Sequence, residues 1–283
     1  MATLAFIKLQ GLGNDFILAE GTALPAGTDL GALARRLCDR HFGIGADGLI
    51  LNWPALQAQA RMQIYNADGS EPEMCGNGLR CFVRYLQLRG EQGPDWSIET
   101  GAGILPATSH SPHDSVRVEM GLPELRPARI PARGFDMEQV VEAELDCEGE
   151  RFAVTLVSMG NPHCVIRVAD LDSLDLAHWG PILETHPAFP ARINVEFVEV
   201  QARDSARVKV WERGAGATLA CGTGACAVVV AGVLGDWLAP AAEICLPGGN
   251  LQIAWPGPDE SVWMEGPAQP VFKGEIDLEA LNG

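Results

Sequence analysis

The stretch Cys75-Gly76-Asn77-Gly78 recurs 146 residues later as Cys221-Gly222-Thr223-Gly224. Gly13-Asn14 recurs in the same way as Gly160-Asn161, at an offset of 147 residues. Two polar positions also match without matching in identity: Asn66 with Glu212, and Asp47 with Asn194. Chance is one interpretation, since glycine is abundant. Four correspondences in order at nearly one offset favour the other, a duplicated fold with a repeat far longer than that of a solenoid.

A thiol placed just before a helix has a distinct chemistry. The unpaired N–H groups and the positive end of the helix dipole lower its pKa and favour the thiolate. The glycines allow close approach of a ligand and leave N–H groups free for an anion such as a carboxylate. A single such cysteine is usually structural. Two equivalent ones, Cys75 and Cys221, suggest thiols that face one ligand and invert a carbon centre by removing and returning a proton.

Polar residues around the motifs suit a zwitterionic ligand. Glu212 and Arg213 follow a predicted strand and offer a carboxylate for an ammonium and a guanidinium for a carboxylate, although a surface ion pair is the alternative. His163 is either a satisfied strand histidine or a catalytic one. Asparagines in glycine-rich or strand-end positions supply amide donors and acceptors, or simply form turns; they are Asn14, Asn66, Asn77, Asn161 and Asn194.

The fold class predicted from the pattern is α+β, with mainly antiparallel sheets. Helices are few, and many short alternating or β-branched runs follow one another closely, separated by Gly, Pro, Asp and Asn. The four expected helices cover 30–42, 76–89, 175–186 and 222–234. Expected strands include 96–100, 116–120, 152–157, 164–168, 195–200, 207–211, 251–255 and 261–264.

The composition limits the classes of protein to which this chain can belong. The chain has 283 residues, 47% of them hydrophobic, which suits two globular domains and argues against disorder. A net charge of −17 without a basic cluster argues against nucleic acid and anionic membranes as partners. The longest apolar run, Ala225–Ala231, is too short to span a membrane, and no signal peptide is recognised, so we expect a cytoplasmic protein. The Pro-rich stretch Leu122–Pro131 is the natural crossing between the two halves.

The eight cysteines are expected to be reduced thiols in a chain of this length without an export signal. No Cys-x-x-Cys pair is present, and no spacing supports a metal site. Only three lysines occur, none near the glycine-rich motifs, which argues against pyridoxal phosphate. Gly43–Gly48 matches a dinucleotide-binding pattern but follows a helix and precedes an apolar run, the reverse of the required context.

Taken together, the motifs closely resemble those of the diaminopimelate epimerase family along the whole chain. The matching segments are Lys8–Phe16, Arg40–Gly48, Tyr65–Ser70, Met74–Cys81, Met159–Cys164, Ile193–Phe197, Glu212–Gly216 and Leu219–Ala227. The resemblance implies a cofactor-independent epimerase that interconverts LL- and meso-2,6-diaminopimelate in lysine and peptidoglycan precursor synthesis. It also implies a homodimer.

The resemblance further implies two pseudo-symmetric α+β domains, each with strands around a central helix, and an active site in the cleft between them. The domains would be residues 1–122 and 123–266, with residues 267–283 returning to the first domain as a strand near Val271–Ile276.

The family's site residues carry over to matching positions here. Cys75 and Cys221 would be the catalytic thiols, and His163 and Glu212 would assist them. The substrate would be held by Asn14, Asn66, Asn77, Asn161, Asn194, Glu212 and Arg213, with the amides of Gly76-Asn77 and Gly222-Thr223 on its reacting carboxylate. Two positions depart from the family pattern: Ala217 replaces a common Glu, and Gly48 stands where some members have Gln. With Glu212 and Arg213 intact, we expect the first departure to change loop contacts rather than activity.

The residues taken by themselves are also compatible with two other functions. One is a different two-cysteine racemase of the same superfamily, acting on proline or another amino acid. The other is a thiol redox or metal-binding protein that uses the eight cysteines. A substrate panel separates the first alternative, and metal analysis with thiol titration separates the second.

Overall fold

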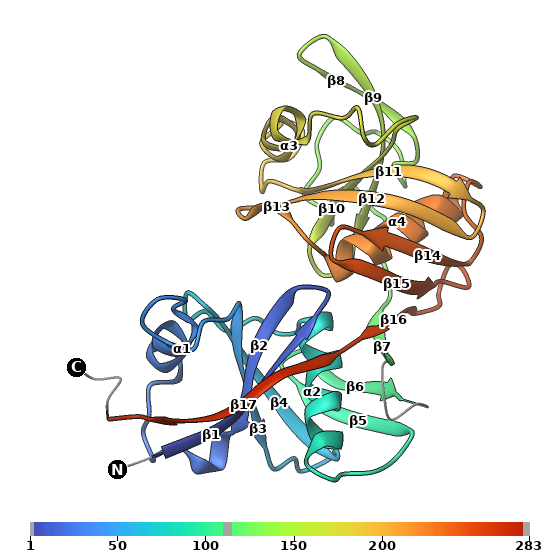
Figure 1. Cartoon of the computed structure of the whole chain (residues 1–283). Helices are drawn as coiled ribbons and strands as arrows, with labels where there is room; N and C mark the ends of the chain where they lie inside the picture. Colours follow the sequence, from blue (N-terminus) through green and yellow to red (C-terminus); the bar gives the residue numbers. More distant parts are fainter. Residues whose placement is uncertain (1–2, 110–114, 280–283) are drawn as a thin grey trace. The chain divides into compact units, whose positions relative to one another are not determined.

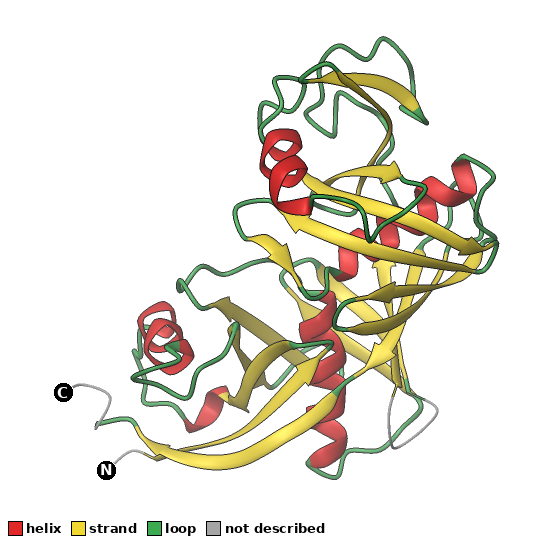
Figure 2. Ribbon diagram, turned by 45° about the horizontal axis from the view of Figure 1, so that its top comes forward, coloured by secondary structure: helices red, strands yellow, loops and turns green. Residues whose placement is uncertain are grey.

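The computed structural model describes residues 3–109 and 115–279 as a mixed α/β protein, mostly strands with four α-helices (Figures 1 and 2). The chain divides into two compact units. Unit 1 comprises the residues up to Val118 together with the segment from Gly266, and unit 2 is Glu119–Glu265. The chain crosses between the units within strand β7 and again within strand β16.

Unit 1 is built around helix α2 (Gly76–Leu88), which packs against β1, β2 and β4. Its strands pair in the order β17-β1-β2-β3-β4-β5-β6-β7, in which β2–β3 and β4–β5 are parallel and the other contacts antiparallel. The strands are β1 (Thr3–Gly11), β2 (Asn14–Glu20), β3 (Gly48–Trp53), β4 (Ala60–Asn66), β5 (Asp95–Thr100), β6 (Gly103–Thr108), β7 (Ser115–Gly121) and β17 (Gln269–Asp277). A 3₁₀ turn (Gly21–Ala23) and helix α1 (Leu30–Cys38) complete the unit.

Unit 2 is built in the same way around helix α4 (Gly222–Leu234), which packs against β9, β10, β11, β14 and β15. Its strands pair in the order β8-β9-β10-β11-β12-β14-β15-β16, with β10–β11 and β12–β14 parallel. The strands are β8 (Ala143–Cys147), β9 (Glu150–Ser158), β10 (Pro162–Arg167), β11 (Asn194–Ala202), β12 (Ser205–Glu212), β13 (Gly216–Thr218), β14 (Ala241–Leu246), β15 (Gly249–Ala254) and β16 (Val262–Pro267). Helix α3 (Leu176–Glu184) lies between β10 and β11 in the chain.

The strand registers of the two units recur at the offset seen in the sequence. The parallel pair Ala60↔Ile98 of unit 1 has its counterpart 146 residues later in Ala206↔Ile244 of unit 2. The ranges of α2 and α4 also differ by 146 residues at both ends. The repeat therefore extends from a few motif residues to the pairing of the strands.

The helix bounds follow local sequence rules to within one residue except at two helix ends, and the helix expected over 175–186 ends at Glu184. Helix α4 is apolar almost all round and is buried along most of its length, as a helix surrounded by strands must be. The helix expected over 30–42 ends four residues earlier, at Cys38, because the Asp39 side chain accepts hydrogen bonds from the N–H groups of His41 and Phe42 and turns the chain. None of the helices over residues 3–109 and 115–279 is long and apolar enough to cross a membrane.

The Pro-rich stretch Leu122–Pro131 is not a free crossing between the halves. Glu124 pairs with Ser158 through both backbone hydrogen bonds, and Ile130 is buried in the apolar core of unit 2. The first boundary between the units follows Val118, four residues before the expected one, and the second follows Glu265, one residue before the expected one. Both boundaries fall inside strands, β7 and β16, rather than in the segments between strands.

The first turn of α1 offers a test of local stability. The Asp29 side chain accepts a hydrogen bond from the N–H of Ala32 at 2.9 Å. We expect Asp29→Ala to destabilise the protein by about 1 kcal/mol, since it leaves helical N–H groups uncapped. Asp29→Ser keeps an oxygen at the cap and should retain most of that stability. Urea unfolding followed by circular dichroism compares the three proteins, and equal midpoints would contradict the capping role.

Candidate active site

Cys75 lies at the N-cap of α2, with extended backbone geometry (φ −143°, ψ 117°). It is half-buried, and its thiol accepts no hydrogen bond from the first turn of the helix. The glycines that follow leave little room for side chains, since a Cβ on Gly78 would lie 3.1 Å from Ile50 Cδ1. Glycine at this position therefore allows the strand side chains to pack against the first turn of α2, where the helical N–H groups begin.

Two predicted asparagines meet beside this helix start. Asn77 Nδ2 donates to Asn14 Oδ1 at 3.3 Å, and Asn14 Nδ2 donates to Asp47 Oδ2 at 2.8 Å. Asn77 is buried, yet its Oδ1 has no hydrogen-bond partner among the described residues. A buried acceptor without a partner costs free energy, so this amide oxygen is available for a donor that a ligand would bring.

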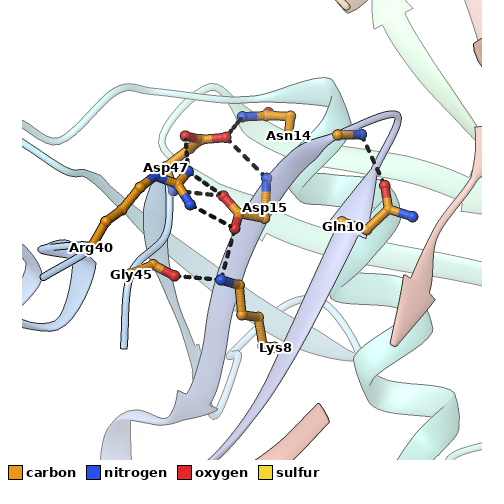
Figure 3. A network of polar contacts seen from close by, with 8 residues as sticks. Lys8, Gln10, Asn14, Asp15, Arg40, Gly45 and Asp47 are labelled. Carbon is orange, nitrogen blue, oxygen red and sulfur yellow. Dashed lines mark hydrogen bonds and ion pairs between the residues drawn. The ribbon is translucent and has the colours of Figure 1, made fainter. Parts of the chain in front are cut away.

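A charged network behind Asn14 fixes this arrangement (Figure 3). Asp15 forms ion pairs of 2.8 Å with both Lys8 and Arg40, and Arg40 Nη2 also donates to Asp47 Oδ1 at 2.7 Å. Burial alone would raise the pKa of Asp15, but hydrogen bonds and charge from Arg40 and Lys8 outweigh it and lower the pKa to about 2. Asp47 is thereby held by a cation on one side while it orients the Asn14 amide on the other.

Asn66 lies at the end of β4, opposite Gly48. Its Nδ2 donates to Ser70 Oγ at 2.9 Å, and its side chain is exposed rather than in contact with Asn14 or Asn77. A Cβ at position 48 would lie 2.8 Å from the carbonyl oxygen of Tyr65. The strand pairing here therefore favours glycine at this departure from the family pattern.

Cys221 occupies the equivalent N-cap of α4 but is more deeply buried than Cys75. Its Sγ accepts a hydrogen bond from the Gly224 N–H at 3.4 Å and lies 3.4 Å from Thr223 Oγ1. Burial, together with the charges of Glu212 and Glu196, raises the pKa of this thiol well above its usual range, although the Thr223 and Gly224 contacts lower it. Burial and the two carboxylates thus act on the Cys221 thiol in the opposite direction to the hydrogen bonds from the helix end.

Glu212 ends β12 and is half-buried beside Cys221. Its Oε1 accepts a hydrogen bond from Thr218 Oγ1 at 2.5 Å. Burial raises the pKa of Glu212, and the negative charge of Glu196 adds to that shift. Ala217 is exposed on β13, and Thr218 beside it supplies the hydrogen bond, so the departure at 217 leaves the Glu212 carboxylate with its partner.

His163 is fully buried on β10 and binds two oxygens. Its Nδ1 lies 2.7 Å from Glu196 Oε1, and its Nε2 lies 3.0 Å from Asn161 Oδ1. Glu196 is also fully buried, on the neighbouring strand β11. The imidazole of His163 therefore lies between Asn161 and Glu196 and joins the three side chains into one chain of contacts.

Asn194 and Arg213 meet through the backbone. Asn194 Oδ1 accepts a hydrogen bond from the Arg213 N–H at 2.9 Å, and its Nδ2 donates to the Pro162 carbonyl at 2.7 Å. Both ends of this buried amide are thus used to join the ends of β10 and β12. The Arg213 guanidinium is exposed, with one nitrogen 3.3 Å from the Ala191 carbonyl.

The turn after Glu212 is anchored by a second buried carboxylate. Glu184 accepts hydrogen bonds from Trp211 Nε1 at 2.8 Å and from the Gly214 N–H at 3.0 Å. Arg192 lies 3.4 Å from the same carboxylate. Glu184 therefore fixes both sides of the turn that carries Glu212 and Arg213.

The predicted residues gather in two groups, one in each unit. Unit 1 carries Asn14, Asn66, Cys75, Gly76 and Asn77; unit 2 carries Asn161, His163, Asn194, Glu212, Arg213, Cys221, Gly222 and Thr223. Sequence reasoning missed the roles of Asp15, Arg40, Glu184, Glu196 and Thr218. A detectable signal existed for Glu196, a carboxylate inside the otherwise apolar run of β11. Within residues 3–109 and 115–279, no group of three or more His, Cys, Asp or Glu side chains is placed to hold a metal ion.

Comparison with known proteins identifies the family. A family model described as Diaminopimelate epimerase matches residues 6–126 and 155–271. A diaminopimelate epimerase of Desulforudis audaxviator is 51% identical over 273 residues, which cover 95% of this chain and 98% of that protein. The chain belongs to the diaminopimelate epimerase family. The predicted resemblance is confirmed, and both motif cysteines lie within the matched residues.

Solved structures show how widely the family's fold is shared. A Bacillus anthracis protein of the PhzF phenazine biosynthesis family superposes with a TM-score of 0.71 at 15% identity, covering 98% of this chain and 100% of that one. A hydroxyproline epimerase from Agrobacterium vitis superposes with a TM-score of 0.66 at 16% identity, covering 98% and 91%. At such low identity these likenesses show the fold alone. The diaminopimelate epimerase family thus shares its architecture with proteins of other names.

The Asp15 network predicts a pH dependence of stability. A carboxyl whose pKa is lowered on folding stabilises the protein while it is ionised, and that contribution is lost as the pH falls from about 4 to about 2. We expect Asp15→Asn to be less stable than the wild type at pH 7 and to show a flatter dependence in this acid range. Thermal unfolding between pH 2 and pH 7 measures both effects. Asp95→Asn, at an exposed position of unit 1, is the control, and a wild-type-like profile for Asp15→Asn would contradict the role of the network.

Proposed function

We propose that this member of the diaminopimelate epimerase family inverts the α-carbon by two-base catalysis, with Cys75 and Cys221 as the two bases. Its activity, epimerisation of diaminopimelate between the LL and meso forms, follows from family membership over nearly the whole chain. The observation that carries the mechanism is that both thiols occupy N-caps of helices that stand at equivalent places in two similarly built units. No cofactor is required, because the proton moves directly between carbon and sulfur.

The environments of the two cysteines suggest how the acid and base roles divide before substrate binds. Burial beside Glu212 and Glu196 raises the pKa of Cys221, which would favour the thiol and suit it to donate a proton. Cys75 is less buried at its helix N-terminus and would act as the thiolate that removes the α-proton. For the reverse reaction the roles exchange: Cys221 gives its proton to one face of the carbon in one direction and regains it in the other. His163 and Glu212 would assist these transfers.

The substrate's charged groups have suitable partners in both units. The N–H groups of Gly76, Asn77, Gly222 and Thr223 would bind the reacting carboxylate and stabilise the negative charge that develops when the proton leaves. The unpartnered Asn77 Oδ1 would accept from an ammonium group. Glu212 and Arg213 would bind ammonium and carboxylate, and Asn14, Asn66, Asn161 and Asn194 would complete the polar surroundings.

The repeated registers support a wider proposal about architecture. Each unit would be one of two pseudo-symmetric halves, a mainly antiparallel sheet around a central helix, and one substrate molecule in the cleft between the halves would meet a thiol from each. The halves would be residues 1–122 with 267–283, and residues 123–266. The enzyme would act in the cytoplasm, in lysine and peptidoglycan precursor synthesis.

Removal of either thiol tests the two-base mechanism. We expect Cys75→Ala and Cys221→Ala each to abolish epimerisation while the protein remains folded, because one face of the carbon then has no proton donor or acceptor. Conversion of LL- to meso-diaminopimelate measures the loss of inversion, and deuterium uptake from D₂O at the α-carbon reports exchange at the face where a thiol remains. Cys245→Ala, a half-buried thiol away from both helix starts, should retain activity. Substantial turnover by either catalytic variant would refute the mechanism. The same deuterium assay with proline and other amino acids measures the substrate preference.

We also propose that the enzyme is a homodimer. Val271 and Phe272 on β17 are large apolar side chains that remain 53% and 45% exposed in the single chain, and an apolar strand surface of this kind is suited to association. We expect light scattering after size-exclusion chromatography to give twice the chain mass of 30.2 kDa. A mass equal to one chain would contradict the proposal.

A further inference from the structure

The helices α1 and α3 are equivalent in the two units, but their last residues differ in chemistry. Their ranges differ by 146 residues at both ends, so Cys38 corresponds to Glu184. In unit 1 Cys38 is buried in an apolar cluster that includes Tyr65 of β4. In unit 2 the Glu184 carboxylate contacts Trp211 of β12, which corresponds to Tyr65 at the same offset. Unit 1 thus packs this helix on its strands without a carboxylate, so packing alone does not explain Glu184.

Both oxygens of the buried Glu184 carboxylate accept hydrogen bonds from groups that can only donate. Oε2 accepts from Trp211 Nε1 at 2.8 Å, and Oε1 accepts from the Gly214 N–H at 3.0 Å and from Arg192 Nη1 at 3.4 Å. Burial alone would raise the pKa of Glu184, but these three partners outweigh it and lower the pKa. At neutral pH the group is therefore a carboxylate with two acceptor oxygens.

Glu184 also holds the segment that leads into β11. Its backbone carbonyl accepts a hydrogen bond from the Ile193 N–H at 3.2 Å, and its side chain pairs with Arg192. Arg192 has a left-handed backbone conformation (φ 57°), which residues other than glycine seldom adopt, so neighbouring contacts must hold it. Glu184 thus joins two segments, the turn after β12 and the segment before β11.

These two segments meet at the Arg213 guanidinium. One guanidinium nitrogen donates to the carbonyl of Ala191, the residue before Arg192, at 3.3 Å. The Arg213 side chain is exposed, and this contact uses one of the five N–H groups of a guanidinium. The Ala191 carbonyl therefore directs the guanidinium and leaves N–H groups for a carboxylate, and Glu184 holds the backbone on both sides of that contact.

We propose that Glu184 is a positioning residue for Arg213: its carboxylate ties the turn after β12 to the segment before β11, so that the Ala191 carbonyl holds the guanidinium in place for a carboxylate of the substrate. The inference rests on the proposed role of Arg213 in substrate binding. Glu212, on the same turn, depends less on Glu184, because its Oε1 has a partner of its own in Thr218. Glu184 therefore affects substrate binding more than proton transfer.

The substitution Glu184→Gln tests the proposal, because an amide has one acceptor oxygen where the carboxylate has two. Its NH₂ group must face either the indole N–H of Trp211 or the N–H of Gly214, and that hydrogen bond is lost. We expect the KM for diaminopimelate to rise about tenfold, the size expected from loss of a hydrogen bond to a charged group, with kcat changed less than about twofold. An unchanged KM would overturn the proposal.

The matched control is Glu199→Gln, on β11 of the same unit. Glu199 also accepts a backbone N–H, from Leu171, and also pairs with an arginine, Arg207, outside both groups of site residues. Its KM should equal that of the wild type. A KM raised equally in Glu184→Gln and Glu199→Gln would contradict a specific role for Glu184.

A double-mutant cycle separates positioning of Arg213 from general damage to the fold. Arg213→Met removes the guanidinium and should itself raise the KM. In that background Glu184→Gln should change the KM less than about twofold, since the group that Glu184 positions is gone. A second tenfold rise in the double variant would overturn the proposal, because Glu184 would then act through another group.

If Glu184→Gln fails to fold, Arg192→Gln takes its place in the cycle. The Arg192 side chain is 59% exposed, so its substitution removes the ion pair with Glu184 without opening the core. We expect the KM to rise about threefold, within the range for an exposed ion pair, and only while Arg213 is present. An unchanged KM, or an equal rise without Arg213, would overturn the proposal.

Hydrogen exchange followed by NMR tests the same contacts without substrate. In Glu184→Gln, the indole hydrogen of Trp211 or the amide hydrogen of Gly214 should exchange about tenfold faster than in the wild type, and both should be unchanged in Glu199→Gln. Unchanged exchange at both positions in Glu184→Gln would overturn the proposal. If the wild type did not turn over diaminopimelate, the proposed function would fail, and the exchange rates would still decide whether Glu184 holds the turn.

Discussion

Close packing of a helix start against a strand is the constraint on which both units depend. The helix is central, so side chains from the strands reach its first turn, and the third residue of each helix has almost no space of its own. At Gly224 a Cβ would lie 2.6 Å from a glutamate oxygen, and at Gly78 it would lie 3.1 Å from an isoleucine methyl group. Glycine there allows the helix to begin inside the unit rather than at its surface. The N-cap cysteine and the free N–H groups of the first turn are placed together as a consequence.

The two units repeat the same arrangement of strands around a helix, but the side chains around the N-termini of α2 and α4 differ. In unit 1 the strand side chains against the third helix residue are Ile50 and Ile64, and the buried carboxylate Asp15 is paired with Lys8 and Arg40. In unit 2 the charges lie against the helix itself, as Glu196 and the partly buried Glu212. Similar backbones thus give the two thiols different electrostatic surroundings, with two carboxylates beside Cys221.

The sequence predicted the structure best where a single physical cause determines which residue type can occupy a position. The apolar run 222–234 predicted α4 with its observed bounds, and the glycine-rich motifs located both N-cap cysteines. It was less informative where a side chain competes with the backbone, since Asp39 ends α1 by accepting two N–H groups that a longer helix would have used. Glu196 and Glu184 were missed for a different reason. Their roles depend on partners 33 and 27 residues away, His163 and Trp211, and no local pattern encodes such contacts.

The asparagines show why a residue type alone does not define a binding role. Asn194 uses both ends of its amide to tie Pro162 to Arg213, so most of its hydrogen-bonding capacity is spent on the fold. Asn77, by contrast, has a buried oxygen without a partner among the described residues. An amide whose donors and acceptor are all hydrogen-bonded within the protein can shape a site but has little capacity left for a ligand. An amide with an unpaired buried oxygen recovers the free energy of the missing hydrogen bond when a ligand donates to it. On the proposed function, we therefore expect Asn77 to contribute directly to substrate affinity and Asn194 to contribute through the position of Arg213.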